Sequence, residues 1–506
     1  MVRYVLGWLC HAFRPPHCSS GCDLRVLIKL SLVSGPRLSG LALAWSLLLT
    51  GCSTASLDVA RHGDDAGTVL KAGQRTATSD IIQAGGKASA SPTSADPSSP
   101  RLRALKQTLA SGGGTETFWK ELASSGTPLI EPVAENESLV TFLWRGAHDS
   151  VRLFGSPSGN HDALQRLGDS DVWWVSYRMP NTARLSYRLA PDVPAIQGSP
   201  MDQRRAILAT AQRDPLNPNV FPPGDDTRVD VFQGDSALSL PDAPTQAWIA
   251  PRADVKPGVL QSHRFISTLL GNERNVWTYI PNGATPKALL VLFDAQAYLE
   301  RVPTPIIIDN LIADGLIPTT AVVLIDNPSR NARSKELPPN PEFAGFLDKE
   351  LMPWVQAQGL LFPANRTVIA GSSYGGLASA YAGLTNPQWF GNVLSLSGSY
   401  WWAPENSMPG WMMRQYAQAP RKNVRFYLDA GRYESGRTGQ YGILETSRHL
   451  GDVLRAKGYT VTQVEHDTGH DYLHWQGSLA CGLVALLAPK KFNALKQCAG
   501  QAPPAD

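Results

Sequence analysis

At residues 371–376 the chain reads Gly-Ser-Ser-Tyr-Gly-Gly, which is a Gly-x-Ser-x-Gly pattern centred on Ser373. The apolar run 367–370 precedes this pattern, and the helix-forming run 377–384 follows it. A serine on a sharp turn between a strand and a helix presents its hydroxyl, and glycines on both sides let the backbone turn tightly. Gly-x-Ser-x-Gly alone is common by chance, but this strand-to-helix context makes Ser373 a candidate nucleophile.

Apolar strands alternate with helical stretches through the second half of the 506-residue chain. Residues 444–454, for example, have a helical pattern. Continuous apolar runs are typical of strands that are covered on both faces of a parallel sheet. We therefore predict the α/β fold class, with residues 246–495 forming an α/β-hydrolase catalytic domain around a mostly parallel, doubly covered sheet. The expected strands cover residues 275–280, 288–293, 320–325, 367–370, 392–396, 424–428 and 460–464.

A different pattern precedes this domain. Between residues 115 and 245, short segments alternate apolar and polar residues with a period of two, and Gly, Asn, Asp and Pro separate them. This pattern predicts a small all-β sandwich at residues 115–245, in which no catalytic constellation is visible. The expected strands are 138–145, 151–154, 171–177 and 183–189.

Activation of Ser373 requires a base, since a serine hydroxyl is a weak nucleophile at neutral pH. His470 is the best placed of the ten histidines because it follows the last expected strand. This position agrees with the order serine, acid, histidine along α/β-hydrolase chains. The acid should follow the strand at 424–428, where Glu434 and Asp429 compete. We prefer Glu434, because the turn before it lets its side chain reach His470, whereas Asp429 directly continues the strand and suits a structural cap.

The oxyanion hole should consist of backbone N–H groups, each contributing about 3–4 kcal/mol in the best cases. One donor is expected at Tyr374, directly after the nucleophile. The other should come from the loop after the strand that ends at Phe293, at Ala295 or Gln296. The pattern predicts the strand end, and leaves the choice between these two residues open.

His466, His470 and His474 recur every four residues, a spacing that would place metal ligands on one face of a helix. However, Asp467-Thr-Gly469 interrupts this register with poor helix formers, and His466 ends an expected strand. We therefore predict no metal site at these histidines, and no cofactor.

The N-terminal region has the pattern of an export signal. A basic stretch ending at Arg37 precedes the apolar run 41–49, which is too short to span a bilayer. The following Leu-Thr-Gly-Cys52 resembles the bacterial lipobox, in which the cysteine is lipidated. The alternative is a chance cysteine behind an ordinary signal peptide. Because Ser53 follows the cysteine, we expect a periplasmic protein that a lipid on Cys52 anchors to the outer membrane.

These features divide the rest of the chain. Residues 1–51 are expected to be a lipoprotein-type signal peptide, and residues 52–114 a lipid-anchored flexible linker rich in Gly, Ser, Ala and Pro. Residues 496–506 form a short tail. Residues 1–51 hold five basic side chains and one acidic one, so the remainder holds 41 basic and 42 acidic. The chain after the signal is close to neutral, and nothing in it indicates a nucleic-acid partner.

Cys481 and Cys498 are the two cysteines that remain after the signal and the lipidation site are set aside. An even number of cysteines in an oxidising compartment favours a disulfide between them. The alternative is two independent buried thiols.

Several segments resemble the enterochelin (enterobactin) esterases, a family of esterase-D-like α/β-hydrolases. The serine motif resembles theirs, as do the segments Leu-Ser-Leu-Ser-Gly-Ser-Tyr-Trp-Trp at 394–402 and Thr-Gly-His-Asp-Tyr-Leu-His-Trp-Gln-Gly at 468–477. The resemblance covers about residues 115–490. Its other segments are Asp-Ala-Gln at 294–296, Arg-Ser-Lys-Glu-Leu at 333–337, Val-Thr-Phe-Leu-Trp-Arg at 140–145 and Asp-Pro-Leu-Asn-Pro at 214–218.

The resemblance implies a serine esterase that hydrolyses ester bonds in the cyclic trilactone of a catecholate siderophore, either ferric or iron-free, and so assists iron release. It implies substrate contacts from a basic residue at Arg333 and from aromatic residues at Trp401 and Trp402. The alternatives are a salt bridge between Arg333 and Glu336, and core packing for the two tryptophans. The roles of nucleophile, base and acid carry over to Ser373, His470 and Glu434.

Two other functions compete with this one. The first is an exported esterase or acyltransferase acting on aryl, carbohydrate or envelope esters, which would have the same catalytic residues. Family members with this front domain are typically cytoplasmic, so the expected export of this chain departs from the family and leaves room for another ester. A lipoprotein that binds a siderophore or glycan without catalysis is the second. The serine, acid and histidine in the expected order argue against the binder.

Overall fold

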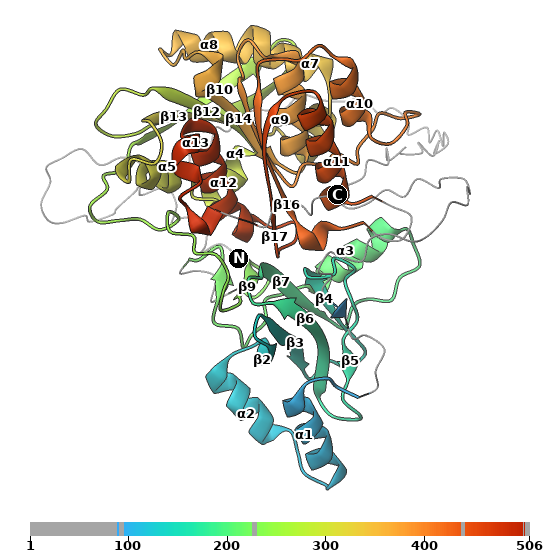
Figure 1. The fold of residues 1–506 in the computed structure, drawn as a ribbon. Helices are drawn as coiled ribbons and strands as arrows, with labels where there is room; N and C mark the ends of the chain where they lie inside the picture. Colours follow the sequence, from blue (N-terminus) through green and yellow to red (C-terminus); the bar gives the residue numbers. More distant parts are fainter. Residues whose placement is uncertain (1–88, 91–95, 225–229, 437–440, 499, 501–506) are drawn as a thin grey trace, which may run out of the picture. The chain divides into compact units, whose positions relative to one another are not determined.

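The computed structural model describes residues 89–90, 96–224, 230–436, 441–498 and 500 (Figure 1). The expected signal peptide 1–51, the lipidation site Cys52 and most of the expected linker lie outside the described residues, as does most of the tail. Among the helices that are described, none combines the length and the apolar character that crossing a membrane requires.

The larger sheet has eight strands in the order β10-β11-β13-β12-β14-β15-β16-β17. From β13 to β17 every neighbouring pair is parallel, while β10 and β11 extend the sheet antiparallel. The strands are β10 (Val259–Ser267), β11 (Asn272–Ile280), β12 (Ala288–Phe293), β13 (Thr320–Ile325), β14 (Thr367–Ser372), β15 (Asn392–Leu396), β16 (Arg425–Gly431) and β17 (Thr460–His466).

Helices cover both faces of this sheet, and the alternation of side chains along β12 shows why. Leu289, Val291 and Phe293 enter one buried cluster, and Leu290 and Leu292 enter the other. Successive residues of a strand point to opposite faces, so a strand that is apolar throughout needs cover on both. On the first face lie α7 (Pro341–Phe346), α8 (Met352–Ala357), α9 (Tyr374–Thr385), α10 (Trp411–Gln418) and α11 (Ile443–Ala456); on the second lie α4 (Ala295–Glu300), α5 (Thr304–Ala313), α12 (Tyr472–Leu487) and α13 (Pro489–Phe492).

The front part of the described chain contains two antiparallel sheets that enclose an apolar cluster between them. Phe142 packs edge-on against Tyr177 of its own sheet and against Tyr187 of the other sheet. One sheet has β1 (Ser89–Ala90), β6 (Val172–Pro180), β3 (Glu137–Arg145), β2 (Leu129–Ala134) and β5 (Gln165–Arg166); the other has β4 (Val151–Gly155), β7 (Arg184–Pro191), β9 (Asp235–Ser239) and β8 (Val220–Phe221). The structure thus confirms the predicted fold class, an all-β sandwich followed by a mostly parallel sheet covered on both faces.

The prediction of a flexible linker up to residue 114 is wrong for its last part. Residues Pro100–Ala110 form helix α1, whose Ser99 cap accepts a hydrogen bond from the backbone N–H of Leu102. Leu102 and Leu105, three residues apart, are buried against helix α2 (Glu116–Ser125) and the first front sheet. A serine cap, proline at the first position and two leucines on one face are enough to form a short packed helix.

The remaining helical segments connect strands or lie outside the two layers of helices that cover the larger sheet. Residues Pro200–Thr210 form α3, which packs on β7, and Arg330–Glu336 form α6 after β13. The other turns are a π-helical segment at Leu347–Leu351 and 3-10 turns at Ala364–Arg366, Arg432–Glu434 and Lys496–Cys498.

Candidate active site

Ser373 lies at the sharp turn between β14 and α9. Its backbone has φ 59° and ψ −120°, and its side chain is buried. Such a conformation costs a non-glycine residue about 1–3 kcal/mol and persists only where neighbours hold it. The backbone N–H of Ser373 donates to the carbonyl of Leu396 at 2.9 Å, and its own carbonyl accepts from Leu377 at 3.1 Å. These two bonds hold the strained turn between the sheet and the helix.

Glycines around Ser373 allow a close approach of backbone segments. A Cβ atom on Gly371 would lie 2.7 Å from the backbone of Gly375, and one on Gly376 would lie 2.6 Å from Ser395 Oγ. Contacts below 3.0 Å are not tolerated, so neither position accepts a side chain without movement of the turn. The glycines of the motif therefore serve packing of the turn as well as its backbone conformation.

His470 and Glu434 form a direct pair. His470 Nδ1 donates to Glu434 Oε1 at 2.6 Å. The other oxygen of Glu434 accepts from the backbone N–H of Gly431 and from Ser397 Oγ, both at 2.7 Å. These bonds fix a buried carboxylate whose remaining oxygen faces the imidazole. Between the two acids that the sequence left in competition, the structure brings Glu434 to His470, while Asp429 lies against two other histidines.

The loop after β15 connects the serine to the histidine pair. Ser399 Oγ lies 3.3 Å from Ser373 Oγ, and Ser399 N donates to the Ser373 carbonyl. Two residues earlier, Ser397 contacts Glu434 and also accepts a bond from Trp475 Nε1 at 3.1 Å. Ser397 and Ser399 were not identified as site residues from the sequence. Their signal was their place directly after a parallel strand, where sites in α/β folds form.

Trp475 supports the histidine from the side. Its ring meets the His470 imidazole edge to face, with centroids 4.9 Å apart and planes at 85°. Trp475 is buried in the first turns of α12, so it provides an immobile surface. This contact restricts rotation of the imidazole about its side-chain bonds and was also missed by the sequence reasoning.

The residues expected to supply the oxyanion hole lie at two neighbouring helix N-termini. Tyr374 begins α9 after β14, and Ala295 and Gln296 begin α4 after β12. Strands β12 and β14 are adjacent, so the two helices start at the same edge of the sheet. N–H groups in the first turn of a helix point out of its N-terminal end, where they stabilise negative charge. The side chain of Gln296 is exposed and donates to Glu300 at 3.3 Å, so its backbone is the relevant group.

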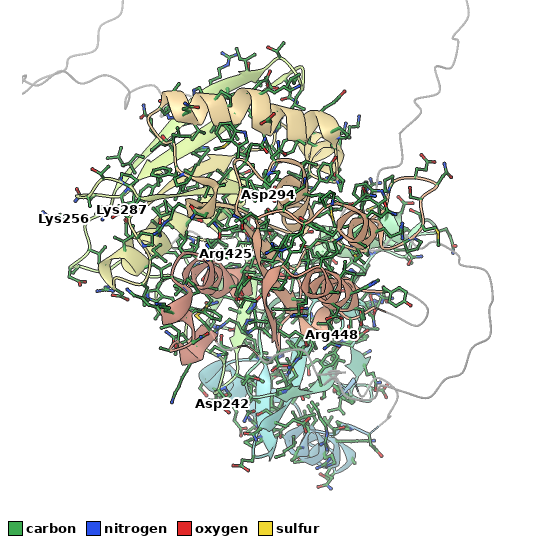
Figure 2. The ribbon with its side chains drawn as sticks, turned by 45° about the horizontal axis from the view of Figure 1, so that its top comes forward. Asp242, Lys256, Lys287, Asp294, Arg425 and Arg448 are labelled. Atoms are coloured by element: carbon green, nitrogen blue, oxygen red, sulfur yellow. A yellow bond between two sulfur atoms is a disulfide. The ribbon has the colours of Figure 1, made fainter. Side chains whose placement is uncertain are left out.

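Arg333 is held by Asp294, which precedes α4 and lies in the interior of the molecule (Figure 2). Its Nε and Nη2 donate to the two carboxylate oxygens of Asp294 at 2.7 and 2.9 Å. The guanidinium also lies 5.8 Å from the ring centroid of Tyr374. The alternative partner considered from the sequence, Glu336, pairs instead with Arg274 at 2.9 Å. Arg333 is therefore beside the site, with its charge balanced by Asp294.

The two tryptophans expected near the site are both partly buried but have different neighbours. The ring centroid of Trp401 lies 6.1 Å from that of Tyr374, the residue after Ser373. Trp402 instead meets Trp411 of α10 edge to face at 5.9 Å. Trp401 thus lies next to the serine turn, and Trp402 belongs to the packing of α10.

Strand β7 of the front sheets holds the loop that carries His470. Thr182 Oγ1, just before β7, donates to Asp467 Oδ2 at 2.5 Å, and Ser186 Oγ donates to Asp471 Oδ1 at 3.0 Å. Burial raises the pKa of Asp471, and hydrogen bonds from the backbone N–H groups of Leu473 and Ser186 oppose this effect. The front sheets therefore bind the loop at two residues, Asp467 and Asp471, that lie before and after His470 in the chain.

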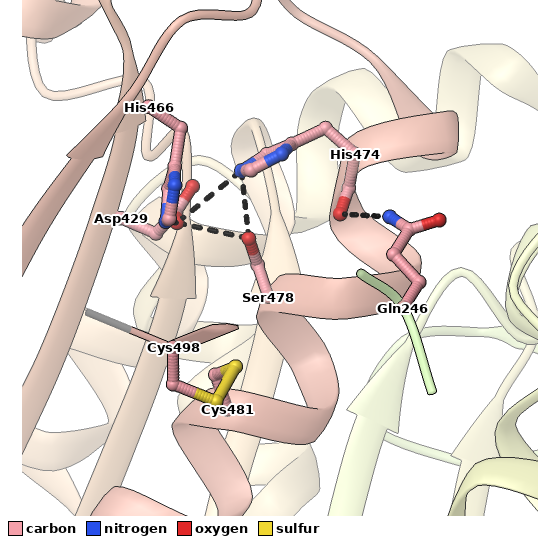
Figure 3. The surroundings of a disulfide bond; sticks show 7 residues. All are labelled: Gln246, Asp429, His466, His474, Ser478, Cys481 and Cys498. Carbon is pink, nitrogen blue, oxygen red and sulfur yellow. Dashed lines mark hydrogen bonds and ion pairs between the residues drawn. A yellow bond between two sulfur atoms is a disulfide. The ribbon is translucent and has the colours of Figure 1, made fainter. Parts of the chain in front are cut away.

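Cys481 and Cys498 are joined by a disulfide that ties α12 to the final turn of the described chain (Figure 3). Their Cα atoms are 5.3 Å apart, and both residues are buried. The bond closes the segment between α12 and the C-terminal turn, on the face of the sheet that α12 covers.

Two family models match the chain. "Enterochelin esterase, N-terminal" matches residues 139–249, and "Putative esterase" matches residues 267–486. The iron(III) enterobactin esterase of Escherichia coli O6:H1 is 31% identical over 408 residues, which are 74% of this chain and 97% of that protein. The iron(III) enterobactin esterase of Yersinia enterocolitica is 34% identical over 355 residues, 63% of this chain and 94% of that protein.

A solved structure agrees with these matches. The crystal structure of the enterobactin esterase from Shigella flexneri in the presence of enterobactin superposes with a TM-score of 0.61 at 30% sequence identity. The comparison covers 74% of this chain and 99% of that chain. The similarity therefore extends over both the front sheets and the larger sheet.

Proposed function

Because the chain belongs to the enterochelin esterase family, we propose that it hydrolyses the ester bonds of a catecholate siderophore trilactone related to enterobactin. Family membership makes it a carboxylic ester hydrolase. The observation that carries the proposal is the 2.6 Å bond from His470 to Glu434, at the same edge of the sheet as the strained Ser373 turn. Hydrolysis of the trilactone would release iron from the ferric siderophore.

The proposed reaction proceeds through an acyl-enzyme. Ser373 Oγ attacks the ester carbonyl carbon while its proton passes to Nε2 of His470. The C–O bond of the ester then breaks, and the imidazolium returns this proton to the departing alkoxide. Water, deprotonated by His470, next attacks the acyl carbon and regenerates the Ser373 hydroxyl. Glu434 keeps Nδ1 protonated and stabilises the imidazolium in both steps.

Negative charge on the carbonyl oxygen would be stabilised by the N-terminal turns of α9 and α4. The backbone N–H of Tyr374 and that of Ala295 or Gln296 are the proposed donors. Donors that are fixed before the reaction need no reorganisation as charge develops. The ion pair between Arg333 and Asp294 supports this arrangement, because Asp294 precedes α4 and Arg333 lies over the Tyr374 ring.

The proposed substrate contacts follow from the same neighbours. Trp401, beside Tyr374, would present an aromatic surface to a catechol ring of the substrate. Arg333 would contribute less direct charge than the sequence suggests, because Asp294 neutralises it. Trp402 would act only indirectly, through its packing against Trp411 of α10.

Replacement of Ser373 by alanine tests the mechanism. We expect Ser373→Ala to lower the rate of enterobactin hydrolysis by at least about 10⁴-fold, as loss of a serine nucleophile does elsewhere. Product 2,3-dihydroxybenzoylserine species would be followed by liquid chromatography. Ser124→Ala, on the exposed side of α2, is the matched control. Full activity of Ser373→Ala would overturn the proposed nucleophile.

A substrate panel tests the ester class. Ferric enterobactin, iron-free enterobactin, feruloyl esters and short-chain esters would be compared by kcat/KM. We expect the two siderophore forms to be the preferred substrates. Activity confined to the feruloyl or short-chain esters would contradict the siderophore assignment and leave the serine mechanism intact.

We also propose that the chain is exported and anchored to the outer membrane, facing the periplasm, by a lipid on Cys52. The apolar run 41–49 and the lipobox-like segment that ends at Cys52 support this location. Growth with labelled palmitate should label the wild type, and Cys52→Ser should lose the label. Cys22→Ser is the control, since it removes a cysteine upstream of the proposed cleavage site. Equal labelling of wild type and Cys52→Ser would contradict the anchor.

A further inference from the structure

Asp429, His466 and His474 bring three potential metal ligands together (Figure 3). Asp429 lies near the end of β16, His466 ends β17, and His474 is in the first turn of α12. One ligand atom from each residue lies within 4.8 Å of the others. The sequence reasoning considered His466 and His474 together with His470, but the structure pairs them with Asp429 and turns His470 toward Glu434.

The two separations between an imidazole and the carboxylate are close to those between ligands around one small ion. His466 Nε2 lies 3.2 Å from Asp429 Oδ2, and His474 Nε2 lies 3.5 Å from the same oxygen. A tetrahedral Zn²⁺ about 2.0–2.1 Å from each of its nitrogen and oxygen ligands separates neighbouring ligand atoms by about 3.3 Å. To accept such an ion, His474 Nε2 would exchange its 2.8 Å contact with Ser478 Oγ for a bond to the metal.

A second observation comes from the other oxygen of Asp429. The Asp429 side chain is fully buried, and within the part of the chain that the structure describes its Oδ1 has no hydrogen-bond partner. Meanwhile Oδ2 receives a bond from Ser478 Oγ at 2.9 Å besides the two imidazole contacts. A buried carboxylate oxygen is nearly always satisfied by a donor or a cation. Because one oxygen of this carboxylate has three partners and the other has none among the described residues, the carboxylate is suited to bind a cation.

An ion could reach this place through a cavity. A cavity of about 90 Å³ borders the cluster and is lined by His466, His474 and Ser478. The carboxylates of Glu465 and Asp467 also line it, but arginine side chains already pair with them: Glu465 with Arg448 and Arg432, and Asp467 with Arg432. Asp429 is thus the carboxylate available to balance an added positive charge.

We propose that Asp429, His466 and His474 bind a divalent transition metal ion such as Zn²⁺. Two imidazoles and one carboxylate are a ligand set that transition ions accept and Mg²⁺ disfavours. Three protein ligands leave a fourth position on the cavity side for solvent. The imidazoles must be neutral to bind, so occupancy rises with pH as metal displaces protons.

The bound ion would clamp the loop that carries His470. His466 and His474 lie on either side of residues 467–473, so one ion would join the end of β17 to the start of α12. Gln246 already holds the α12 side, donating to the carbonyls of Leu473 and His474. The metal would therefore act as a positioning element for His470 and take no part in the ester chemistry.

Zn²⁺ titration of the purified full chain, after dialysis against a chelator, tests the site by calorimetry. We expect one Zn²⁺ site that Mg²⁺ does not occupy, and at least 10-fold weaker Zn²⁺ binding for His466→Gln and for His474→Gln. His449→Gln, an exposed histidine on α11, is the matched control and should bind like the wild type. Absence of Zn²⁺ binding by the wild type, or binding as tight as wild type by the two cluster variants, would overturn the proposal.

X-ray absorption at the zinc edge tests the ligands without any substitution. We expect nitrogen and oxygen neighbours at about 2.0–2.1 Å with outer scattering from two imidazoles. Sulfur neighbours would instead place the ion on cysteines and contradict the proposed site. Zn²⁺ should also slow amide hydrogen exchange at residues 467–473, and unchanged exchange there would contradict the clamp. None of these measurements uses an ester substrate, so their failure leaves the proposed esterase function unaffected.

Discussion

Ser373, Glu434 and His470 are held in place by different physical means. Ser373 is presented by a strained backbone, with φ 59°, that bonds to β15 and α9. Glu434 is fixed by donors from Gly431 and Ser397, and His470 by Glu434 together with the face of a buried tryptophan. Because each of the three groups is restricted separately, each is held in a fixed position and orientation. Such positioning of reacting groups supplies a large part of the rate acceleration by enzymes.

At the residue scale, Glu434→Gln tests the role of the carboxylate. A neutral amide no longer stabilises the imidazolium and permits the wrong histidine tautomer, so we expect kcat to fall by about 10²- to 10⁴-fold with little change in KM. Steady-state hydrolysis of enterobactin provides the measurement. Glu405→Gln, an exposed glutamate, should keep wild-type kinetics. Wild-type kcat in Glu434→Gln would show that the carboxylate takes no part in catalysis.

Asp214 in the front sheets offers a residue-scale test of stability against pH. Burial raises the pKa of Asp214 above its usual 3.8, although hydrogen bonds from Tyr187 and from the backbone N–H of Leu216 oppose the shift. The folded chain therefore holds this proton at pH values where the unfolded chain has lost it. The contribution of the Asp214 carboxyl to the free energy of unfolding is therefore fully present below about pH 3.8, and it is lost as the pH rises through the raised pKa.

Replacing Asp214 by asparagine removes this titration. We expect the free energy of unfolding of the wild type, relative to Asp214→Asn, to decrease as the pH rises from about 4 and to level off above the raised pKa. Urea unfolding at a series of pH values measures the difference. Asp169→Asn, at an exposed position, should run parallel to the wild type. A difference that stayed constant with pH, or grew, would refute the assigned shift.

At the scale of elements, the sites are built from the ends of parallel strands. Ser373 and Ser397 directly follow β14 and β15, Asp429 lies near the end of the neighbouring β16, and α4 and α9 begin at the same edge. Because the carboxyl ends of parallel strands meet at one edge, side chains 26 residues apart (Ser373 and Ser399) and 37 residues apart (Ser397 and Glu434) come within hydrogen-bonding reach. Helix α12 then covers the sheet and brings Trp475 and His474 to the same place.

The disulfide between Cys481 and Cys498 should stabilise the attachment of α12 to the C-terminal turn. It closes a short loop, with 17 residues of sequence separation, for which loop-closure entropy predicts a contribution of about 3 kcal/mol. We expect the Cys481→Ser, Cys498→Ser double variant to lose about this free energy of unfolding in urea. A reductant should destabilise the wild type to a similar extent and leave the double variant unchanged. A loss below about 0.5 kcal/mol would argue against the role.

At the scale of the whole described chain, the front sheets contribute to the site although they carry no catalytic residue. Thr182 and Ser186 bond to Asp467 and Asp471, and so hold both sides of His470. Both acceptors are carboxylate oxygens, and a hydrogen bond to an ionised carboxylate is stronger than one between neutral groups. The front sheets are therefore expected to act as a support for the loop with the general base.

Ser186→Ala tests this support. Loss of a hydrogen bond to a charged group is worth about 1.5–3 kcal/mol, so the His470 loop should be held less well. We expect kcat to fall by roughly 10-fold at unchanged KM, since the substrate contacts remain. Ser138→Ala removes a serine hydrogen bond to the neutral amide oxygen of Asn181, elsewhere in the front sheets, and should leave kcat unaltered. Equal effects of the two variants would indicate a general loss of stability in place of loop positioning.

The sequence alone determined the features that depend on neighbours along the chain. Apolar runs and their spacing predicted the parallel strands, and Gly-Ser-Ser-Tyr-Gly-Gly predicted the strand-to-helix turn at Ser373. Strand β10 and helices α1 and α2 were missed. Strand β10 is largely exposed and polar, and α1 follows a segment of linker-like composition, so neither carries a strong periodic signal.

Only the tertiary structure decided which distant side chains meet. The contact of Glu434 with His470, the bonds of Ser397 and Ser399, and the grouping of Asp429 with His466 and His474 follow from strand order and from how α12 packs. The pattern of apolar and polar residues restricts the backbone conformation over only a few residues. The distance between groups far apart in sequence depends instead on how the helices pack to bury both apolar faces of the sheet.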